Sequence, residues 1–447
     1  MDVSYKTLQQ EIRDLNDKSY EKRIQAARVL GKEIQDGRLK RNVLEQVNNH
    51  VHTTYSFSPY EPASAAFKAW EAGLGIVGAI DHDSIGAARE LLEVTQLLGM
   101  ASTVGFELRA GFKNTPFAEN RLNNPDSPGI GYMCVHGVPY GKLDDCKIFL
   151  SSVCKARGLR NQQMVDKFNS LGLGITIDYE DDVLPLSRHE EGGSVTERHI
   201  LYAIAGKIIE QNGKGKALVD YLEKSLGLVL NKKQEEYLLD VKNPHYVYDL
   251  LGILKTTLLS QFFIQPNENE CPDVRDVLAF SNSIGAISAY AYLGDVGASP
   301  TGDKKAQSFE DAYLDEFIPY IAALGFKAVT YMPPRNTRAQ MERIVKLCRE
   351  NNLMQISGVD VNSSRQSFNC PELLDPVCSH LIESAWALVA HEKLSSVNPK
   401  LGLFSRSNPL RDLDLDSRIK KYANIGRGLD HFNVQESALE LSKSICV

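Results

Sequence analysis

The stretch NNHVHTTYSFSP, residues 48–59, is the part of this sequence that decides the fold. His50 and His52 lie two positions apart in a β-prone run. Alternate residues of a strand project to the same face, so the two imidazoles can bind one metal ion. A predicted helix follows from Glu61 to Ala72 and ends at Gly73, which can serve as its C-cap. This order of elements predicts the first βα unit of a parallel sheet.

The same alternation of short apolar runs and helix-length segments continues along most of the chain. About seven strands are predicted, one ending near His52 and the others at Gly75–Ile80, Ala101–Phe106, Gly131–Val135, Gly285–Ala291, Lys327–Tyr331 and Leu353–Ser357. His82, Glu107 and His136 each follow a predicted strand, at the edge where barrel enzymes build their sites. Imidazole and carboxylate ligands together suit zinc, iron or manganese. Each residue alone also has an ordinary explanation, as a neighbour of a helix cap, a solvated strand end or a partner of a backbone carbonyl.

Three regions flank or interrupt the predicted barrel, which spans residues 42–399. Residues 1–41 carry apolar side chains three or four positions apart, which predicts an N-terminal arm of amphipathic helices. Residues 200–278 are largely helix-forming and too long for a simple loop, so they predict a helical insertion. Residues 400–447 are expected to form a mixed-charge C-terminal tail.

Composition restricts the class of protein. The 447 residues are 43% hydrophobic and 24% charged, as in soluble globular chains. The 50 Lys and Arg against 57 Asp and Glu give a net charge of −7, so general nucleic-acid binding is not expected. No apolar run is long enough to span a membrane, and the first residues show no signal pattern, so we expect a cytoplasmic protein. The eight cysteines form no CxxC pair and are expected to be reduced.

Segments from Asn48 to Asn362 resemble the polymerase and histidinol phosphatase (PHP) family of metal-dependent phosphoesterases. In that family's order, they are NNHVHTTYSFSP, GIVGAIDHDS, VGFELRA, CVHGVP, SVTERHI, GAISAYAYLGD and ISGVDVN. The first three together are the most specific. The resemblance implies an α/β fold, a distorted seven-stranded (β/α) barrel of PHP type, with metals at the C-terminal ends of its strands.

The resemblance also implies the metal ligands. The first metal would be bound by four residues that are all present: His50, His52, Glu107 and Asp360. Glu107 would bridge to a second metal, which His136 would also bind. At the remaining position of that second site, Tyr292 replaces the family's histidine, and its phenol must lose a proton to bind.

The third metal site of the family is weakened in this chain. It would use His82 with an aspartate and a late histidine, and here those last two positions hold Phe57 and Asn362. A phenyl ring has no donor atom, and an amide is a weaker ligand than imidazole for a transition metal. We therefore expect one tightly bound divalent ion and a second, weaker one, the metal being manganese, zinc or iron.

The segment Glu197-Arg198-His199 resembles the Arg-Pro-His segment that contacts phosphate in the family, with Glu197 at the usual arginine position. His199 is expected to orient phosphate or protonate the leaving alkoxide. Arg198 is a neighbouring candidate. Arg157 and Arg160 lie on a predicted helix, where a guanidinium can bind phosphate bidentately, and Arg160 is the better candidate of the two. Solvation at the surface is the alternative for both.

These residues predict a metal-dependent hydrolase that cleaves a phosphate ester of a small molecule with metal-activated water. Two alternatives remain open. A PHP-like binding or regulatory protein that has lost turnover would explain the altered positions Phe57, Tyr292 and Asn362. A hydrolase of C–N bonds would use the same ligand types to activate water. The expected partner is a small phosphorylated molecule, not a membrane, and the sequence leaves the oligomeric state open.

Overall fold

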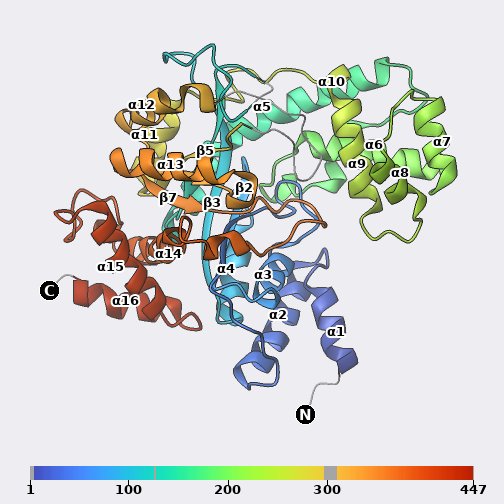
Figure 1. Ribbon diagram of the computed structural model, residues 1–447. Helices are drawn as coiled ribbons and strands as arrows, with labels where there is room; N and C mark the ends of the chain where they lie inside the picture. The colour runs from blue at the N-terminus through green and yellow to red at the C-terminus, as the bar shows by residue number, and fades with distance from the viewer. Residues whose placement is uncertain (1–4, 125–126, 296–309, 446–447) are drawn as a thin grey trace.

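The computed structural model describes residues 5–124, 127–295 and 310–445, and its centre is a seven-stranded sheet in which the strands follow one another in chain order (Figure 1). The strands are β1 (Val47–Val51), β2 (Ile76–His82), β3 (Ala101–Gly111), β4 (Ile130–His136), β5 (Ile287–Tyr292), β6 (Ala328–Tyr331) and β7 (Met354–Ser357). The segment after β7 returns to β1, where His52 N donates to Val361 O at 3.0 Å and Val361 N donates to His50 O at 3.2 Å. The sheet is therefore a nearly closed barrel, which confirms the predicted α/β fold.

One strand departs from the expected parallel arrangement. β4 pairs antiparallel with both β3 and β5, whereas the other neighbouring strands pair parallel. Parallel strands need a long crossover, usually a helix, but the described residues between Gly111 and Ile130 contain none, so the chain turns straight back. The prediction of a parallel sheet is wrong for β4. As a result, His136 pairs with Ile287 at the beginning of β5, away from the edge where the parallel strands end.

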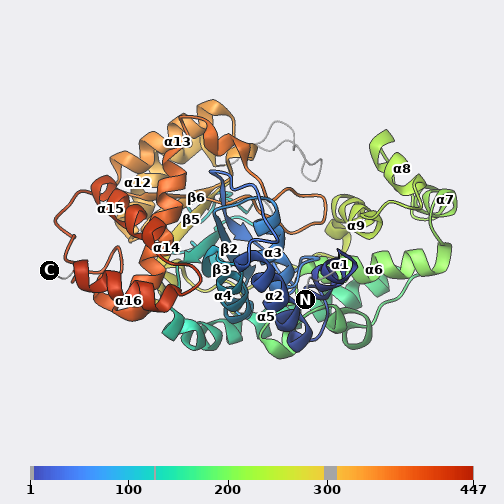
Figure 2. The same cartoon turned by 90° about the horizontal axis from the view of Figure 1, so that it is seen from below.

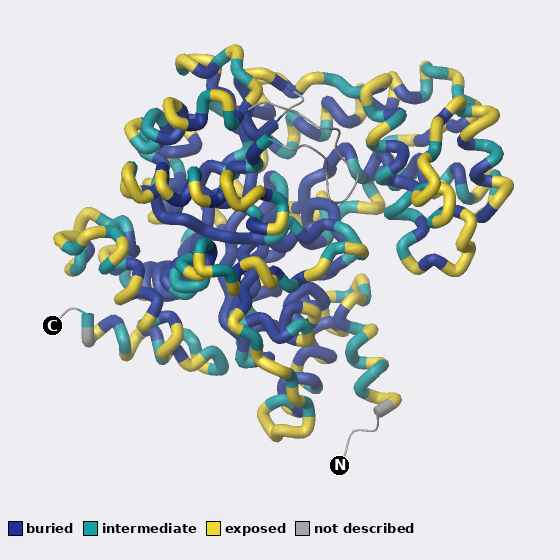
Figure 3. Tube along the Cα trace, viewed as in Figure 1, coloured by how far each residue is buried: buried dark blue, intermediate teal, exposed yellow. Residues whose placement is uncertain are grey.

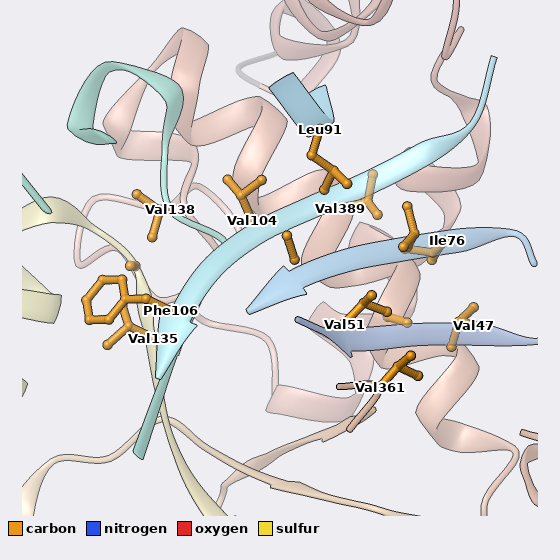
Figure 4. Close-up of a cluster of buried hydrophobic side chains, with 14 of the residues drawn as sticks. Val47, Val51, Ile76, Leu91, Val104, Phe106, Val135, Val138, Val361 and Val389 are labelled. Carbon is orange, nitrogen blue, oxygen red and sulfur yellow. The ribbon is translucent and has the colours of Figure 1, made fainter. Parts of the chain in front are cut away.

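Helices cover the outside of the barrel (Figure 2). They are α3 (Pro62–Glu71), α4 (Ala88–Leu97), α5 (Leu143–Ser170), α11 (Val274–Ile284), α12 (Leu314–Leu324), α13 (Arg338–Glu350) and α14 (His380–Val397). Between sheet and helices lies a continuous apolar core, in which Val104 of β3 lies near Leu91 of α4 and Val389 of α14, while Phe106 lies beside Val135 of β4 (Figure 4). Fully burying such a side chain contributes about 1.5–3 kcal/mol, so the core fixes the strand positions that carry the site.

The N-terminal arm predicted over residues 1–41 contains two helices, α1 (Tyr5–Asp14) and α2 (Tyr20–Gln35). α2 is fixed to the barrel by Arg23, which is fully buried. Its Nε and Nη2 atoms donate to the two carboxylate oxygens of Glu90 on α4, at 2.7 Å and 2.6 Å. A bidentate pair of this kind sets the orientation of the arm as well as its attachment.

A lobe of five helices extends from one side of the barrel, in green and yellow-green in Figure 1. They are α6 (Glu197–Asn212), α7 (Lys216–Lys224), α8 (Lys232–Leu239), α9 (Tyr246–Thr257) and α10 (Leu259–Phe262). The lobe has its own core, which includes Phe168 at the end of α5 and Ile177. The lobe and the predicted insertion, 200–278, therefore have different bounds. The core of the lobe includes residues before 200, and α11 packs in the barrel core.

Residues 400–445 are helical and packed, although their mixed charge predicts a tail. They contain α15 (Leu415–Gly428) and α16 (Val434–Ile445), which lie against α14. Tyr422 is fully buried, and its Oη donates to Leu401 O at 2.5 Å. The buried trace in Figure 3 continues from the barrel into this region. Within the parts of the chain that the structure describes, no helix is both long and apolar enough to cross a membrane.

Candidate metal centre

Five side chains that are far apart in the sequence converge inside the barrel. His50 and His52 come from the end of β1, His82 from the end of β2, Glu107 from within β3 and Asp360 from the segment after β7. His82 and Glu107 are register partners in the β2–β3 pair, and closure of the barrel between β1 and residue 361 brings in Asp360. The structure thus brings together the four residues expected around a first metal, with His82 beside them.

Glu107 is at the middle of this cluster. His50 Nε2 lies 3.5 Å from its Oε2 atom, and His52 Nε2 lies 3.4 Å from its Oε1 atom. His82 Nδ1 lies 2.8 Å from the same Oε1 atom. On its other side, His52 Nε2 lies 3.1 Å from Asp360 Oδ1. Both carboxylates therefore face imidazole nitrogens on the inside of the barrel.

The imidazole nitrogens are suited to hold a cation. His50 Nε2, His52 Nε2, His82 Nδ1 and His136 Nε2 are buried and make no hydrogen bond of acceptable geometry. Leaving a buried polar atom without a hydrogen bond costs about 1–3 kcal/mol, so four such nitrogens beside two carboxylates need an explanation. A divalent ion bound by these nitrogens and carboxylate oxygens would satisfy them together.

A second layer of hydrogen bonds orients His52 for this role. Thr53 N and Ser56 Oγ donate to Asp81 Oδ1 at 2.7 Å and 2.6 Å. Ser56 Oγ also lies 3.1 Å from His52 Nδ1. The serine has one hydroxyl proton, which goes to Asp81, so His52 Nδ1 is the donor to Ser56. In the neutral imidazole, Nε2 then carries the lone pair that faces the centre, as metal binding requires.

Electrostatics keep the carboxylates ionised. Burial raises the pKa of Glu107, but the imidazoles of His82 and His50 outweigh it and hold that pKa well below its usual range. Burial likewise raises the pKa of Asp360, and His52 more than reverses the effect. Burial lowers the pKa of His50, but the Glu107 carboxylate raises it well above its usual range, so a proton competes with a metal there.

The cluster opens to solvent on one side. The side chain of Asp360 is 36% exposed and that of His82 is 21% exposed, whereas His52 is fully buried and Glu107 is 7% exposed. Water can therefore reach the cluster on the side of Asp360 and His82. The opposite side of Glu107 is closed by the barrel interior.

The side chain of β4 that lies next to Glu107 is Cys134, whereas the expected ligand from this strand was His136. Among the described residues, the groups of ligand atoms within 4.8 Å of one another include Cys134 with His50 and Glu107, but not His136. His136 is two positions further along the same face of β4, and burial followed by the charge of His50 lowers its pKa to about 3. The sequence reasoning missed Cys134, although the period of two in Cys134-Val135-His136 could have identified it.

Tyr292, Phe57 and Asn362, at the three altered ligand positions, contact other side chains in the structure. Tyr292 Oη donates to Asp311 Oδ1 at 2.6 Å, and burial together with that carboxylate raises the pKa of the phenol, which opposes the predicted role as a phenolate ligand. Phe57 packs in the lobe core, edge-on to His199 at 5.0 Å between ring centroids. Asn362 Nδ2 donates to Asp360 Oδ1 at 2.6 Å, so its amide positions Asp360.

His199 lies in the first turn of α6 and completes its N-terminal cap. Thr196 N donates to His199 Nδ1 at 2.9 Å, which forms a capping box. The ring is 1% exposed, and burial followed by the charge of Arg157 lowers its pKa to about 3. His199 is therefore neutral at ordinary pH, which does not favour the expected role in protonating a leaving group.

The arginines expected to bind phosphate are buried and paired with carboxylates. Arg160 Nη2 donates to Glu197 Oε1 and its Nε donates to Glu270 Oε2, both at 2.5 Å. Arg157 Nη2 donates to Glu197 Oε2 at 2.6 Å and its Nη1 donates to Asp83 Oδ2 at 2.5 Å. Solvation at the surface is therefore wrong for Arg157 and Arg160, which are buried. Carboxylates occupy most of the donors that were expected to bind a phosphate. The partners Glu197 and Glu270 were not recognised from the sequence.

Arg198 is placed differently from these paired arginines. Its side chain is half-buried, and its Nη1 atom donates to Asn362 Oδ1 at 2.7 Å. Asn362 in turn holds Asp360, so Arg198 lies at the open side of the cluster. Of the expected phosphate-binding residues, Arg198 is the one whose guanidinium the structure brings to the candidate metal centre.

The fold and the cluster define an α/β barrel protein with a candidate metal centre. No family model and no curated protein matches the chain. It is similar to a Bifidobacterium adolescentis protein provisionally described as a metal-dependent phosphoesterase, with 18% identity, a TM-score of 0.49 and coverage of 76% of this chain and 96% of that one. It is also similar to an amidohydrolase from Chromobacterium violaceum, with bound sulfate and no metal, at 14% identity, a TM-score of 0.49 and the same 76% and 96% coverage. Neither likeness assigns an activity.

Proposed function

We propose that this protein is a metal-dependent hydrolase of PHP type that cleaves a phosphate ester of a small molecule. The observation that carries the proposal is the convergence of buried imidazole nitrogens, which make no hydrogen bond, on the two oxygens of Glu107, with Asp360 at the open side. One or two divalent ions, manganese, zinc or iron, suit such a set of nitrogen and oxygen ligands.

A divalent ion, when bound, supplies Lewis acidity toward water and toward a phosphoryl oxygen. The residues of the chain prepare the place for it. Ser56 fixes His52 with Nε2 toward the centre, and the ionised oxygens of Glu107 and Asp360 provide the negative charge that favours a cation. The exposure of Asp360 leaves the side on which a substrate enters.

Arg198 is the group that we assign to phosphate recognition. Its contact with Asn362 places a positive charge beside Asp360, and its half-exposed position allows it to donate to a phosphate oxygen. His199 supports it indirectly, because the capping box fixes the first turn of α6, which carries Arg198. In this proposal Arg160 and His199 position other groups and do not contact the substrate.

A second candidate, hydrolysis of a C–N bond, is favoured by one observation. The guanidinium groups of Arg157 and Arg160 donate hydrogen bonds to the carboxylates of Glu197, Glu270 and Asp83. These donors are therefore already engaged and are not available to a phosphate. A substrate without a phosphate would not need them. The same metal centre would then activate water toward an amide.

The test combines metal analysis with a substrate screen. Purified protein is loaded separately with manganese, iron and zinc and assayed against phosphate monoesters, phosphate diesters and amides. Glu107→Gln should lose metal and activity together, while His189→Ala, a change at an exposed histidine outside the cluster, should keep both. Turnover of amides alone would establish the second candidate. Bound metal without any turnover would indicate a binding or regulatory protein.

A further inference from the structure

The two oxygens of Glu107 face two different pairs of side chains. Oε1 is directed toward His52 and His82, at 3.4 Å and 2.8 Å from their ring nitrogens. Oε2 is directed toward His50 Nε2, at 3.5 Å, and toward the thiol of Cys134, whose Sγ lies 3.8 Å away. The carboxylate can therefore present one oxygen to each of two ligand groups, and the second group contains sulfur.

The antiparallel direction of β4 explains why a thiol lies there. Cys134 is the register partner of Glu107 across the β3–β4 pair. Directly opposite residues of an antiparallel pair have their Cβ atoms about 4.5–5.5 Å apart on one face of the sheet. Cys134 is fully buried, and its Sγ lies 3.8 Å from Glu107 Oε2. The backbone thus fixes the thiol next to Oε2.

A second observation points to a ligand at this place. The His50 side chain is 10% exposed, and its Nε2 atom is buried without a hydrogen bond. The ligand atoms of His50, Glu107 and Cys134 lie within 4.8 Å of one another. An imidazole nitrogen, a carboxylate oxygen and a sulfur this close together are three of the ligand types that zinc binds in its four-coordinate sites.

We propose that His50, Glu107 and Cys134 form a thiolate-containing metal site that selects zinc, or another thiophilic ion such as cobalt(II), over manganese and magnesium. When the site is filled, the S–H bond breaks, the sulfur donates an electron pair to the ion and the proton passes to water, so no oxidant or reductant is needed. Thiolate is a soft ligand that suits zinc, whereas manganese and magnesium prefer oxygen. This inference rests on the proposed metal centre but not on its substrate.

Cobalt(II) provides the test, because a thiolate bound to cobalt gives a charge-transfer absorption in the near ultraviolet that imidazole and carboxylate do not give. Apoprotein is loaded with cobalt(II), and its spectrum is compared with those of Cys134→Ser and Cys134→Ala. The control is Cys146→Ser, which changes an equally buried cysteine in the apolar core. Wild type and Cys146→Ser should show the band, and both Cys134 variants should lack it while the visible bands of bound cobalt persist.

A competition between zinc and manganese gives a second readout. Loss of Cys134 should lower the preference for zinc over manganese by at least about tenfold, the effect of losing even an outer partner of a metal ligand. Bound cobalt without a charge-transfer band in wild type would overturn the inference, and so would a band or a zinc preference that survives in Cys134→Ala. The cobalt spectrum of the wild type can overturn the inference by itself, so the test remains decisive even if a variant misfolds.

The outcomes separate this inference from the proposed function. A thiolate band in a protein that cleaves no phosphate ester would support the site and contradict the proposed substrate. Hydrolysis by a protein whose bound cobalt gives no band would support the function and overturn the thiolate site.

Discussion

Replacing Glu197 with glutamine tests whether the buried arginine cluster is neutralised from within. Glu197 Oε1 accepts from Arg109 at 2.8 Å and from Arg160 at 2.5 Å, and Oε2 accepts from Arg157 at 2.6 Å. Burial raises the pKa of Glu197, but the three guanidinium groups, Arg109 first, hold it well below its usual range. The carboxylate is therefore ionised in the folded protein at neutral pH.

The expected cost follows from the charges. In the cluster, Arg109, Arg157 and Arg160 are balanced by three carboxylates, those of Asp83, Glu197 and Glu270. Glutamine has nearly the same size and keeps one acceptor oxygen, but it leaves one positive charge unbalanced. Removing one partner of a buried ion pair costs about 3–5 kcal/mol. Because one acceptor is retained, Glu197→Gln should lower the free energy of unfolding by about 3 kcal/mol.

Urea denaturation followed by circular dichroism measures this free energy. The matched control is Glu268→Gln, because Glu268 is 78% exposed and pairs with Lys113 at the surface, so its loss should change stability little. Added sulfate should stabilise Glu197→Gln more than wild type, since an anion can restore the missing charge. If Glu197→Gln is no less stable than the control, the cluster does not depend on Glu197 and the reasoning is refuted.

The same variant has a predicted pH dependence. The folded-state pKa of Glu197 is depressed, so its contribution to stability is present above the ordinary value of 4.5 and is lost as the pH falls toward the folded pKa. The difference in stability between wild type and Glu197→Gln should therefore shrink below about pH 4.5. A difference that grows on acidification would contradict the assigned charge state.

Three further changes probe other parts of the molecule. Burial lowers the pKa of His391 to about 4, and its Nδ1 atom accepts a hydrogen bond from Leu403 N at 2.9 Å. The free energy of unfolding of the wild type should therefore fall by up to about 1.4 kcal/mol per pH unit as the pH is lowered from about 6.5 to about 4. Urea titrations of His391→Asn should show a flatter pH dependence. Tyr292→Phe should leave metal content unchanged while the lost hydrogen bond to Asp311 lowers the free energy of unfolding by about 1.5–3 kcal/mol. Arg198→Ala should weaken inhibition by inorganic phosphate about tenfold and keep the metal; loss of metal would place Arg198 in a different role.

The strand positions and most of the cluster could be predicted from the sequence because the signals are local. His50 and His52 share a strand face by a period of two, and Glu107 follows a short apolar run. The direction of β4 was also encoded, since residues 112–129 are rich in Asn and Pro and have no helical period, which is typical of a direct return. The expectation of a parallel sheet throughout gave the wrong direction for β4.

The arginine cluster could not be predicted from such signals. Arg157 and Arg160 are three residues apart and share a face of a predicted helix, but that face reads equally well as solvated. The partners of Arg160 lie 37 and 110 positions away, in α6 and in the segment before α11. Which carboxylates meet these guanidinium groups is decided by the packing of the helical lobe on the barrel, a long-range property.

Alternate residues of a strand point to opposite faces of the sheet, and this alternation decides which side chains can reach Glu107 Oε2. In β5, Ala289 and Ala291 lie on the inner face with Cys134, while Tyr292 is on the other face and contacts Asp311. A shift of one residue exchanges the two faces of a strand, so matching Tyr292 to an inward histidine by sequence order puts the wrong side chain in the barrel. Ala289 and Ala291 carry no donor atom, and among the described residues the ligand atoms grouped with Glu107 on its Oε2 side come from His50 of β1 and Cys134 of β4. This makes the thiol of Cys134 the side chain whose chemistry decides which metal can bind there.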